Sequence, residues 1–91
     1  MKVKIQLPPV LRHTADGARL VPAQGATIAE AIADLASRNP SLALHFYDEG
    51  KRIRRNIVFL HAGEAVRAND AVSKAVKDGD EIVVTNALAG G

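Results

Sequence analysis

The chain has 91 residues, with 12 Lys and Arg against 10 Asp and Glu, three His and no cysteine, and its formal net charge is +2. This length predicts one domain, and the lack of cysteine excludes disulfides, thiolate metal sites and a thiol nucleophile. The near balance of charge requires no nucleic-acid partner. With no apolar run long enough for a membrane span and no signal-peptide pattern at the N-terminus, we expect a soluble cytoplasmic monomer without a membrane partner.

The N-terminal residues predict a β-hairpin. Apolar and polar residues alternate over residues 2–7, which is the period of a strand with one buried face. The prolines at 8–9 should end its pairing, because proline has no N–H to donate. A turn at Asp16-Gly17 then leads into a second strand over residues 18–21.

Residues 27–38 predict the main helix. Thr27 is a good N-cap, and Glu30 three positions later completes a capping box. Apolar residues recur at the spacing of one buried helical stripe, which consists of Ile28, Ala31, Ile32, Leu35 and Ala36. Asn39-Pro40 ends this helix, and we expect no other main helix.

Residues 41–55 predict a long connection that packs under the helix. Its apolar side chains should be buried, namely those of Leu42, Leu44, Phe46 and Tyr47. The connection ends in a basic run over residues 51–55, for which three interpretations stay open. The first is a solvated strand edge, where charge discourages edge-to-edge pairing. The second is that Arg52, Arg54 and Arg55 dock on an acidic face of a partner enzyme. Nucleic-acid binding ranks third, because residues that could stack on bases are scarce.

The remaining residues predict three strands. The first, over residues 57–60, is apolar enough to be buried on both faces. The second is short, at 66–67, and follows a turn at 62–64. A helical turn over 70–76, with Val72 and Val76 pointing inward, and a tight turn at 77–80 lead to the last strand at 81–85. The order is therefore β-β-α-β-β-β, an α+β fold in which one helix covers a mixed sheet of four or five strands.

The first and last strands should form a central parallel pair, because both are strongly apolar. We expect a folded domain over residues 1–86 and a flexible tail over residues 87–91. The tail ends on Gly90-Gly91, and a residue without Cβ can approach a reactant closely. The terminal carboxylate of Gly91 has an ordinary pKa of about 3.3–3.7 and is ionised near neutrality.

Other candidate sites are weaker. His13, His45 and His61 have no metal-ligand spacing, and we expect each to lie at the surface or in a loop. The serines lack the His and carboxylate pattern of a nucleophilic triad. No glycine-rich phosphate loop is present.

The order of elements, the turn Asp78-Gly79-Asp80-Glu81 and the ending Ala87-Leu88-Ala89-Gly90-Gly91 together resemble the β-grasp, ubiquitin-like sulfur carriers. This family includes the small subunit of molybdopterin synthase and the thiamine-pathway carrier. Residues 55–67 and the Ala-x-Ala-Gly-Gly ending are more similar to the cysteine-pathway carriers. Thr85-Asn86-Ala87 lacks the proline that family members often carry before the tail, which points away from the molybdopterin subunit.

The resemblance implies a β-grasp protein that is not an enzyme and binds no cofactor. An E1-like adenylating enzyme would use ATP and Mg to activate Gly91, and sulfur would convert it to a thiocarboxylate. A sulfur-accepting biosynthetic enzyme would then use that sulfur for a cysteine- or methionine-type amino acid, a siderophore or a cofactor. Gly90, Ala89 and Leu88 would be recognised by the partners. A JAMM-type metalloprotease is a further possible partner, where an extension beyond Gly91 needs removal.

Two alternatives to the sulfur carrier remain open. One is a ubiquitin-like modifier that Gly91 joins to lysines of other proteins. The other is a β-grasp interaction module without tail chemistry.

Overall fold

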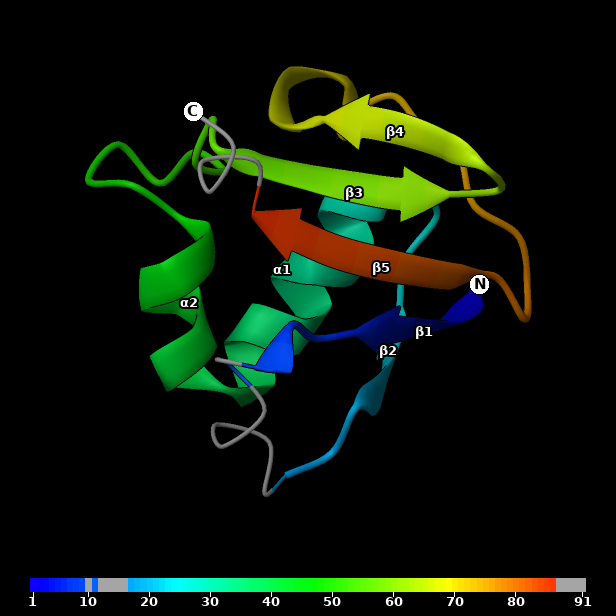
Figure 1. The fold of residues 1–91 in the computed structure, drawn as a ribbon, viewed down its shortest axis with the longest axis horizontal. Coiled ribbons are helices and arrows are strands. Elements are labelled where there is room, and N and C mark those ends of the chain that lie inside the picture. Colours follow the sequence, from blue (N-terminus) through cyan, green and yellow to red (C-terminus); the bar gives the residue numbers. More distant parts are fainter. Residues whose placement is uncertain (10, 12–16, 87–91) are drawn as a thin grey trace.

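The structure is a computed structural model that describes residues 1–9, 11 and 17–86. Its strands and helices follow one another along the chain as shown in Figure 1. They are β1 (Lys2–Gln6), β2 (Leu20–Gln24), α1 (Ile28–Arg38), α2 (Pro40–Phe46), β3 (Ile57–His61), β4 (Glu64–Arg67), the 3-10 turn η2 (Ala68–Asp70) and β5 (Glu81–Asn86).

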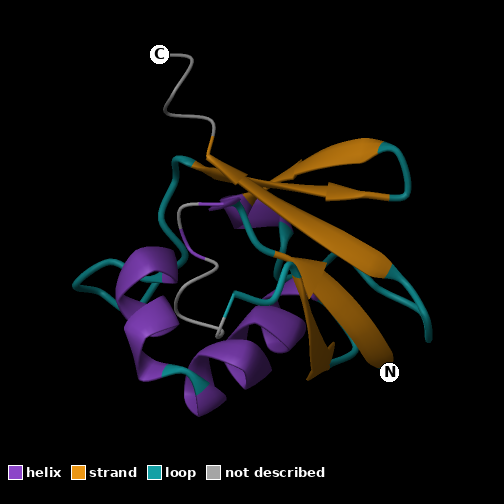
Figure 2. Cartoon of the chain, turned by 60° about the horizontal axis from the view of Figure 1, so that its bottom comes forward, coloured by secondary structure: helices purple, strands orange, loops and turns teal. Residues whose placement is uncertain are grey.

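The strands form one five-stranded mixed sheet in the order β2-β1-β5-β3-β4. β1 and β5 run parallel at its centre, with Ile5 beside Ile82, which confirms the predicted central pair. All other neighbouring strands are antiparallel. Figure 2 shows the two layers that result, with the strands on one side and the helices on the other. The α+β prediction is therefore confirmed.

The core lies between α1 and the inner face of the sheet. Every second residue of the strands points into it, as the alternation in residues 2–7 predicted. The largest fully buried side chains are those of Phe46, Phe59, Ile5, Leu7, Ile28, Ile32, Leu35, Leu42 and Ile82. The predicted apolar stripe of α1 is buried in full. Thr27 caps this helix by accepting a hydrogen bond from the N–H of Glu30 at 3.2 Å.

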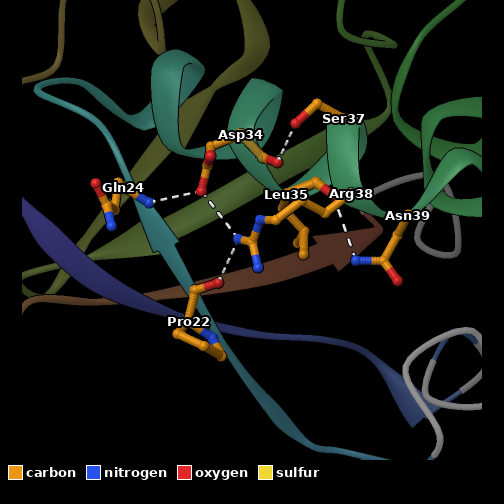
Figure 3. Close-up of polar contacts among 7 residues, drawn as sticks. All are labelled: Pro22, Gln24, Asp34, Leu35, Ser37, Arg38 and Asn39. Carbon is orange, nitrogen blue, oxygen red and sulfur yellow. Dashed lines mark hydrogen bonds and ion pairs between the residues drawn. The ribbon is translucent and has the colours of Figure 1, made fainter.

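The polar side of α1 is bound to the edge strand β2 (Figure 3). Asp34 Oδ2 accepts hydrogen bonds from the backbone N–H of Gln24 and from Arg38 Nη2, each at 2.9 Å. Arg38 Nη2 also donates to the carbonyl oxygen of Pro22 at 2.7 Å. The Gln24 N–H, and then the Arg38 guanidinium, lower the pKa of Asp34 below its ordinary value. These side chains of α1 thereby bind the Gln24 N–H and the Pro22 carbonyl oxygen. Both are backbone groups of an edge strand, which could otherwise pair with a strand of another chain.

The prediction of a single helix is wrong, because α2 begins directly after α1 ends. Pro40 does end α1, but it also occupies the first turn of α2. Proline suits that position, where the N–H it lacks would have no partner within the helix. α2 buries Leu42 and Phe46 but leaves Leu44 76% exposed, so the predicted burial of Leu44 is also wrong.

Three further predictions need correction. The second strand lies at 20–24 instead of 18–21, with Pro22 tolerated because β2 is at the sheet edge. β3 is buried on one face only, since Leu60 is 42% exposed. Val76 is buried as expected, whereas Val72 is 68% exposed, so the predicted inward orientation of Val72 is wrong. The predicted helical turn does begin at Asp70, because the N–H of Lys74 donates to the Asp70 carbonyl oxygen at 3.1 Å directly after η2.

Candidate functional site

The C-terminal strand β5 carries the tail. It has six residues and lies between β1 and β3 at the centre of the sheet. Its last residue, Asn86, still pairs with Ile57. The tail residues predicted to act, Leu88, Ala89, Gly90 and Gly91, lie outside the described residues, as does the proposed tail boundary at 87. The described part of the site is therefore the strand that holds the tail and the surfaces around it.

The turn Asp78–Glu81 fixes the start of β5 against the start of β1. Asp78 Oδ1 accepts the N–H of Lys2, and the N–H of Gly79 donates to the carbonyl oxygen of Lys2, both at 2.8 Å. The N–H of Lys4 donates to the Asp80 carbonyl oxygen at 2.9 Å. Gly79 has a φ of 86°, which glycine adopts without strain. The motif noted in the sequence thus joins two strands that are distant in the chain.

Asp80 and His61 form the polar contact behind this turn. His61 Nε2 lies 2.7 Å from Asp80 Oδ2, which also accepts the N–H of Lys77 at 2.9 Å. The hydrogen bond from His61, followed by that of Lys77, lowers the pKa of Asp80 below its ordinary value. Only 7% of the His61 side chain is exposed, so the prediction of a surface or loop histidine is wrong for this residue. His45 is exposed on α2 as predicted, and His13 lies outside the described residues.

The outer face of the sheet, away from α1, carries an apolar row beside the tail-bearing strand. Leu60 of β3 pairs with Val83 of β5 on one side and with Ala65 of β4 on the other. Leu60 and Ala65 are exposed and Val83 is partly exposed. The sequence predicted these strands but assigned residues 57–60 to a strand buried on both faces, and so missed this row.

A small cavity lies beside the end of β5. Its volume is about 220 Å³, and Thr85 at its margin donates from Oγ1 to the carbonyl oxygen of Val58 at 2.8 Å. The described residues that line the cavity are Pro8, Leu11, His45, Phe46, Asn56, Ile57, Val84 and Thr85. The base of the tail is therefore next to a mostly apolar recess built from four separate segments.

The basic run over residues 51–55 is a loop between α2 and β3, so its interpretation as a strand edge is wrong. Arg52, Arg54 and Arg55 are all exposed. Arg54 Nη2 donates to the carbonyl oxygen of Leu44 at 3.1 Å, which holds this side chain against α2. Arg55 is two residues before Ile57, the partner of Asn86. Of the three arginines, Arg55 is thus nearest along the chain to the residue paired with the base of the tail.

Within residues 1–9, 11 and 17–86, no three His, Asp or Glu side chains are grouped so that they could hold a metal ion. No helix in the described part of the chain is both long and apolar enough to cross a membrane.

Comparisons with known proteins agree with this geometry. The ThiS family matches residues 5–91. Sulfur carrier protein CysO of Mycobacterium tuberculosis is 28% identical over 93 residues, which covers 100% of both chains. The solved BexX/CysO complex from Amycolatopsis orientalis contains a chain that is 34% identical, with a TM-score of 0.81 and coverage of 98% of this chain and 99% of that one. SAMP1 from Haloferax volcanii has the same TM-score of 0.81 at 26% identity, with 100% of both chains covered. The predicted β-grasp fold is confirmed by these neighbours.

Proposed function

This chain belongs to the ThiS family, whose match extends over residues 5–91, and we propose that it is a sulfur carrier acting through the terminal carboxylate of Gly91. The observation that carries the proposal is the full-length similarity to the sulfur carrier protein CysO, combined with an ending on two glycines. The family resemblance noted in the sequence is thereby confirmed.

In the proposed cycle the carrier is a substrate of its partners and binds no cofactor itself. An E1-like enzyme uses ATP and Mg²⁺ to join the Gly91 carboxylate to AMP, with release of pyrophosphate. Sulfide then attacks the acyl carbon and AMP leaves, so that one C–O bond is broken and one C–S bond is formed. A biosynthetic enzyme takes the sulfur from the resulting thiocarboxylate for a sulfur-containing amino acid, siderophore or cofactor.

The rigid attachment of β5 supports this role. The strand is paired on both sides, and the Asp78–Glu81 turn holds its start against β1. A partner that binds the sheet therefore receives the tail from a fixed point at Asn86. Leu88, Ala89 and Gly90 would then be recognised within the partner's channel, and Gly91 would reach the reacting atoms.

The apolar row of Leu60, Val83 and Ala65 is the surface we assign to the activating enzyme. It flanks β5 on the outer face, where a bound enzyme would be close to the tail. Exposed apolar residues that adjoin one another are typical of protein interaction sites. Arg55, which is near the base of the tail, would add charge complementarity to an acidic surface of the activating enzyme. Arg52 and Arg54 would make a smaller contribution of the same kind.

The direct test is intact mass measurement after incubation with the activating enzyme, ATP, Mg²⁺ and sulfide. We expect the mass to rise by the difference between sulfur and oxygen, and only when ATP is present. A chain that lacks Gly90 and Gly91 should show no change. An unchanged mass for the full chain with an enzyme that is active on its own carrier would contradict the proposal.

A matched pair of variants tests the docking surface. Leu60→Asp should raise the KM of the activating enzyme by about tenfold or more, because a charge replaces an apolar contact at the interface. Leu44→Asp changes a side chain that is also exposed, but on α2, and should leave KM unchanged. Equal effects of the two variants would show that Leu60 has no special part in docking.

A second candidate function is favoured by the neighbour from Haloferax volcanii, whose name is small archaeal modifier protein 1. In this case Gly91 would form an isopeptide bond with lysines of other proteins. Lysine-linked adducts in extracts of cells that express the tagged chain would support it, provided they vanish when Gly90 and Gly91 are deleted. A JAMM-type metalloprotease would cleave such isopeptide bonds. It would also expose Gly91 where a C-terminal extension has to be removed.

A further inference from the structure

A groove lies between α1, the loop after α2 and the segment after β4. Its volume is about 390 Å³. Its floor and walls are largely apolar, with Tyr47 and Ile53 partly buried and Val72 68% exposed. The described residues that line it are Ala29, Tyr47, Lys51, Arg52, Ile53, Ala68, Asn69 and Val72.

Both walls of the groove are held by backbone hydrogen bonds. On one side, Tyr47 and Ile53 form an antiparallel bridge, and the N–H of Asp48 donates to the Arg52 carbonyl oxygen at 2.8 Å. On the other side, the N–H of Ala29 donates to the Ala71 carbonyl oxygen at 3.0 Å. The groove is therefore a preformed feature of the fold.

Exposed cations line this groove and a recess next to it. Lys51 and Arg52 line the groove itself, whereas Arg55 and Arg67 line an adjoining recess of about 80 Å³ that shares Ala68 and Asn69 with it. All four cationic side chains are exposed. Among the described residues, the ion pairs involve none of the four.

The Asp48 carboxylate belongs to the same loop and offsets part of this charge. Asp48 Oδ1 accepts the N–H groups of Gly50 and Arg52 at 2.8 and 3.1 Å. The Arg52 N–H, then that of Gly50 and the charges of Arg52 and Arg54, lower the pKa of Asp48 below its ordinary value. The Asp48 carboxylate is therefore engaged by groups of its own loop. Among the described residues, the ion pairs include none that joins Lys51, Arg55 or Arg67 to a carboxylate.

We propose that this groove binds an acidic peptide segment of another protein, with one apolar side chain seated between Tyr47 and Val72. Exposed cations at the apolar groove and at the recess that adjoins it match a ligand that carries carboxylates next to an apolar residue. A nucleic acid fits less well, because base binding requires exposed aromatic faces. Both phenylalanines are fully buried, and Tyr47 is the only tyrosine in the chain.

The test is an NMR titration of the isotope-labelled full chain with a capped peptide in which one leucine stands between two pairs of glutamates. We expect a Kd of about 1 mM or tighter, with amide shifts confined to the groove and the adjoining recess, at residues 29, 47–55 and 67–72. Two control peptides separate the contributions. Replacing the glutamates by glutamines removes the charge, and replacing the leucine by serine removes the apolar anchor, so each should weaken binding by about tenfold.

Charge reversals locate the site on the protein. Lys51→Glu combined with Arg52→Glu should weaken peptide binding by about tenfold, and Arg55→Glu combined with Arg67→Glu provides an independent pair. Arg19→Glu is the matched control, because Arg19 is exposed beside β2 at the opposite edge of the sheet. Thermal melting of each variant verifies that it is folded.

Three results would overturn the proposal. They are equal binding of the glutamine peptide, shifts outside the groove and the adjoining recess, and equal weakening by Arg19→Glu. A short oligonucleotide of the same charge that caused the same shifts with higher affinity than the peptide would show that the groove binds phosphate groups. That result would also overturn the acidic-peptide proposal. Because the titration uses neither ATP nor sulfide, its failure leaves the sulfur-carrier proposal standing, and a failed thiocarboxylate assay leaves the groove proposal standing.

Discussion

His61 Nε2 lies 2.7 Å from Asp80 Oδ2 and joins the end of β3 to the turn that starts β5. His61 is at the same time paired with Ile82 across the sheet. In this environment, His61 Nδ1 has no hydrogen-bond partner within the described part of the chain. The contact with Asp80 is therefore the polar interaction that the structure provides for a buried imidazole.

The first prediction concerns the acid stability that Asp80 confers. Its pKa is lower in the folded chain than the ordinary value of 3.8, so its contribution is fully present above that value and is lost as the pH falls through the folded-state pKa. Urea unfolding, followed by circular dichroism between pH 7 and pH 2, measures the free energy of unfolding. On acidification this free energy should fall less for Asp80→Asn than for the unchanged chain. Asp34 and Asp48 also have lowered pKa values, and they affect both proteins equally.

The prediction would be contradicted if the free energy of unfolding depended on pH in the same way for Asp80→Asn and for the unchanged chain. Glu81→Gln is the matched control, because Glu81 is the exposed neighbour of Asp80. It should leave the acid dependence close to that of the unchanged chain.

The second prediction compares two leucines of α2. Leu42 is fully buried and Leu44 is 76% exposed. Leu42→Ala should lower the free energy of unfolding by about 2–5 kcal/mol, because it removes apolar contacts and leaves a cavity. Leu44→Ala should change it by less than about 0.5 kcal/mol. Chemical denaturation measures both, and similar losses for the two variants would mean that α2 is oriented differently.

The third prediction concerns Gly25, whose backbone packs closely against the first turn of α1. A Cβ built at this position would be 2.5 Å from the backbone nitrogen of Ala31. Gly25→Ala should therefore shift the helix and destabilise the fold by about 1–3 kcal/mol. At Gly50 the nearest atom to such a Cβ is Asp48 Oδ1, at 3.4 Å. Gly50→Ala is thus the control and should unfold at nearly the temperature of the unchanged chain.

The fourth prediction concerns the β3–β4 hairpin. Ala62 and Gly63 connect the strands with φ values of 52° and 82°. This combination is typical of a type I′ turn, in which Asn-Gly is preferred. Ala62→Asn should stabilise the protein by about 0.5 kcal/mol or more, and Ala62→Val should destabilise it, because β-branched residues disfavour positive φ. A melting temperature that is higher for the valine variant would refute the assignment of the turn.

The sequence alone predicted most of the fold because the strands and α1 carry strong periodic patterns. The alternation over residues 2–7 and the stripe from Ile28 to Ala36 each match a single secondary structure. Asn39-Pro40 was ambiguous for a physical reason, since proline both ends one helix and starts another. A short apolar strand such as 57–60 is equally ambiguous, because its composition does not say whether a second layer covers its outer face.

The candidate site was predictable in part. The Asp78–Glu81 turn is a local signal that the structure confirms, whereas the role predicted for Gly90-Gly91 stays a prediction. The burial of His61 was not predictable, because it depends on Asp80, 19 positions along the chain. The basic groove was also inaccessible, because Lys51 and Asn69 meet only through the packing of the loop after α2 against the segment after β4.

The parallel pairing of β1 and β5 has a practical consequence for biochemical work. Lys4 lies beside Glu81, so the N-terminus is at the end of the sheet where β5 begins, opposite Asn86 (Figure 1). The six residues of β5 separate the two ends by about 17–20 Å. A fluorophore or a surface linker attached ahead of Met1 should therefore lie away from Asn86, where β5 ends, and this attachment suits the tests of the role proposed for Gly91.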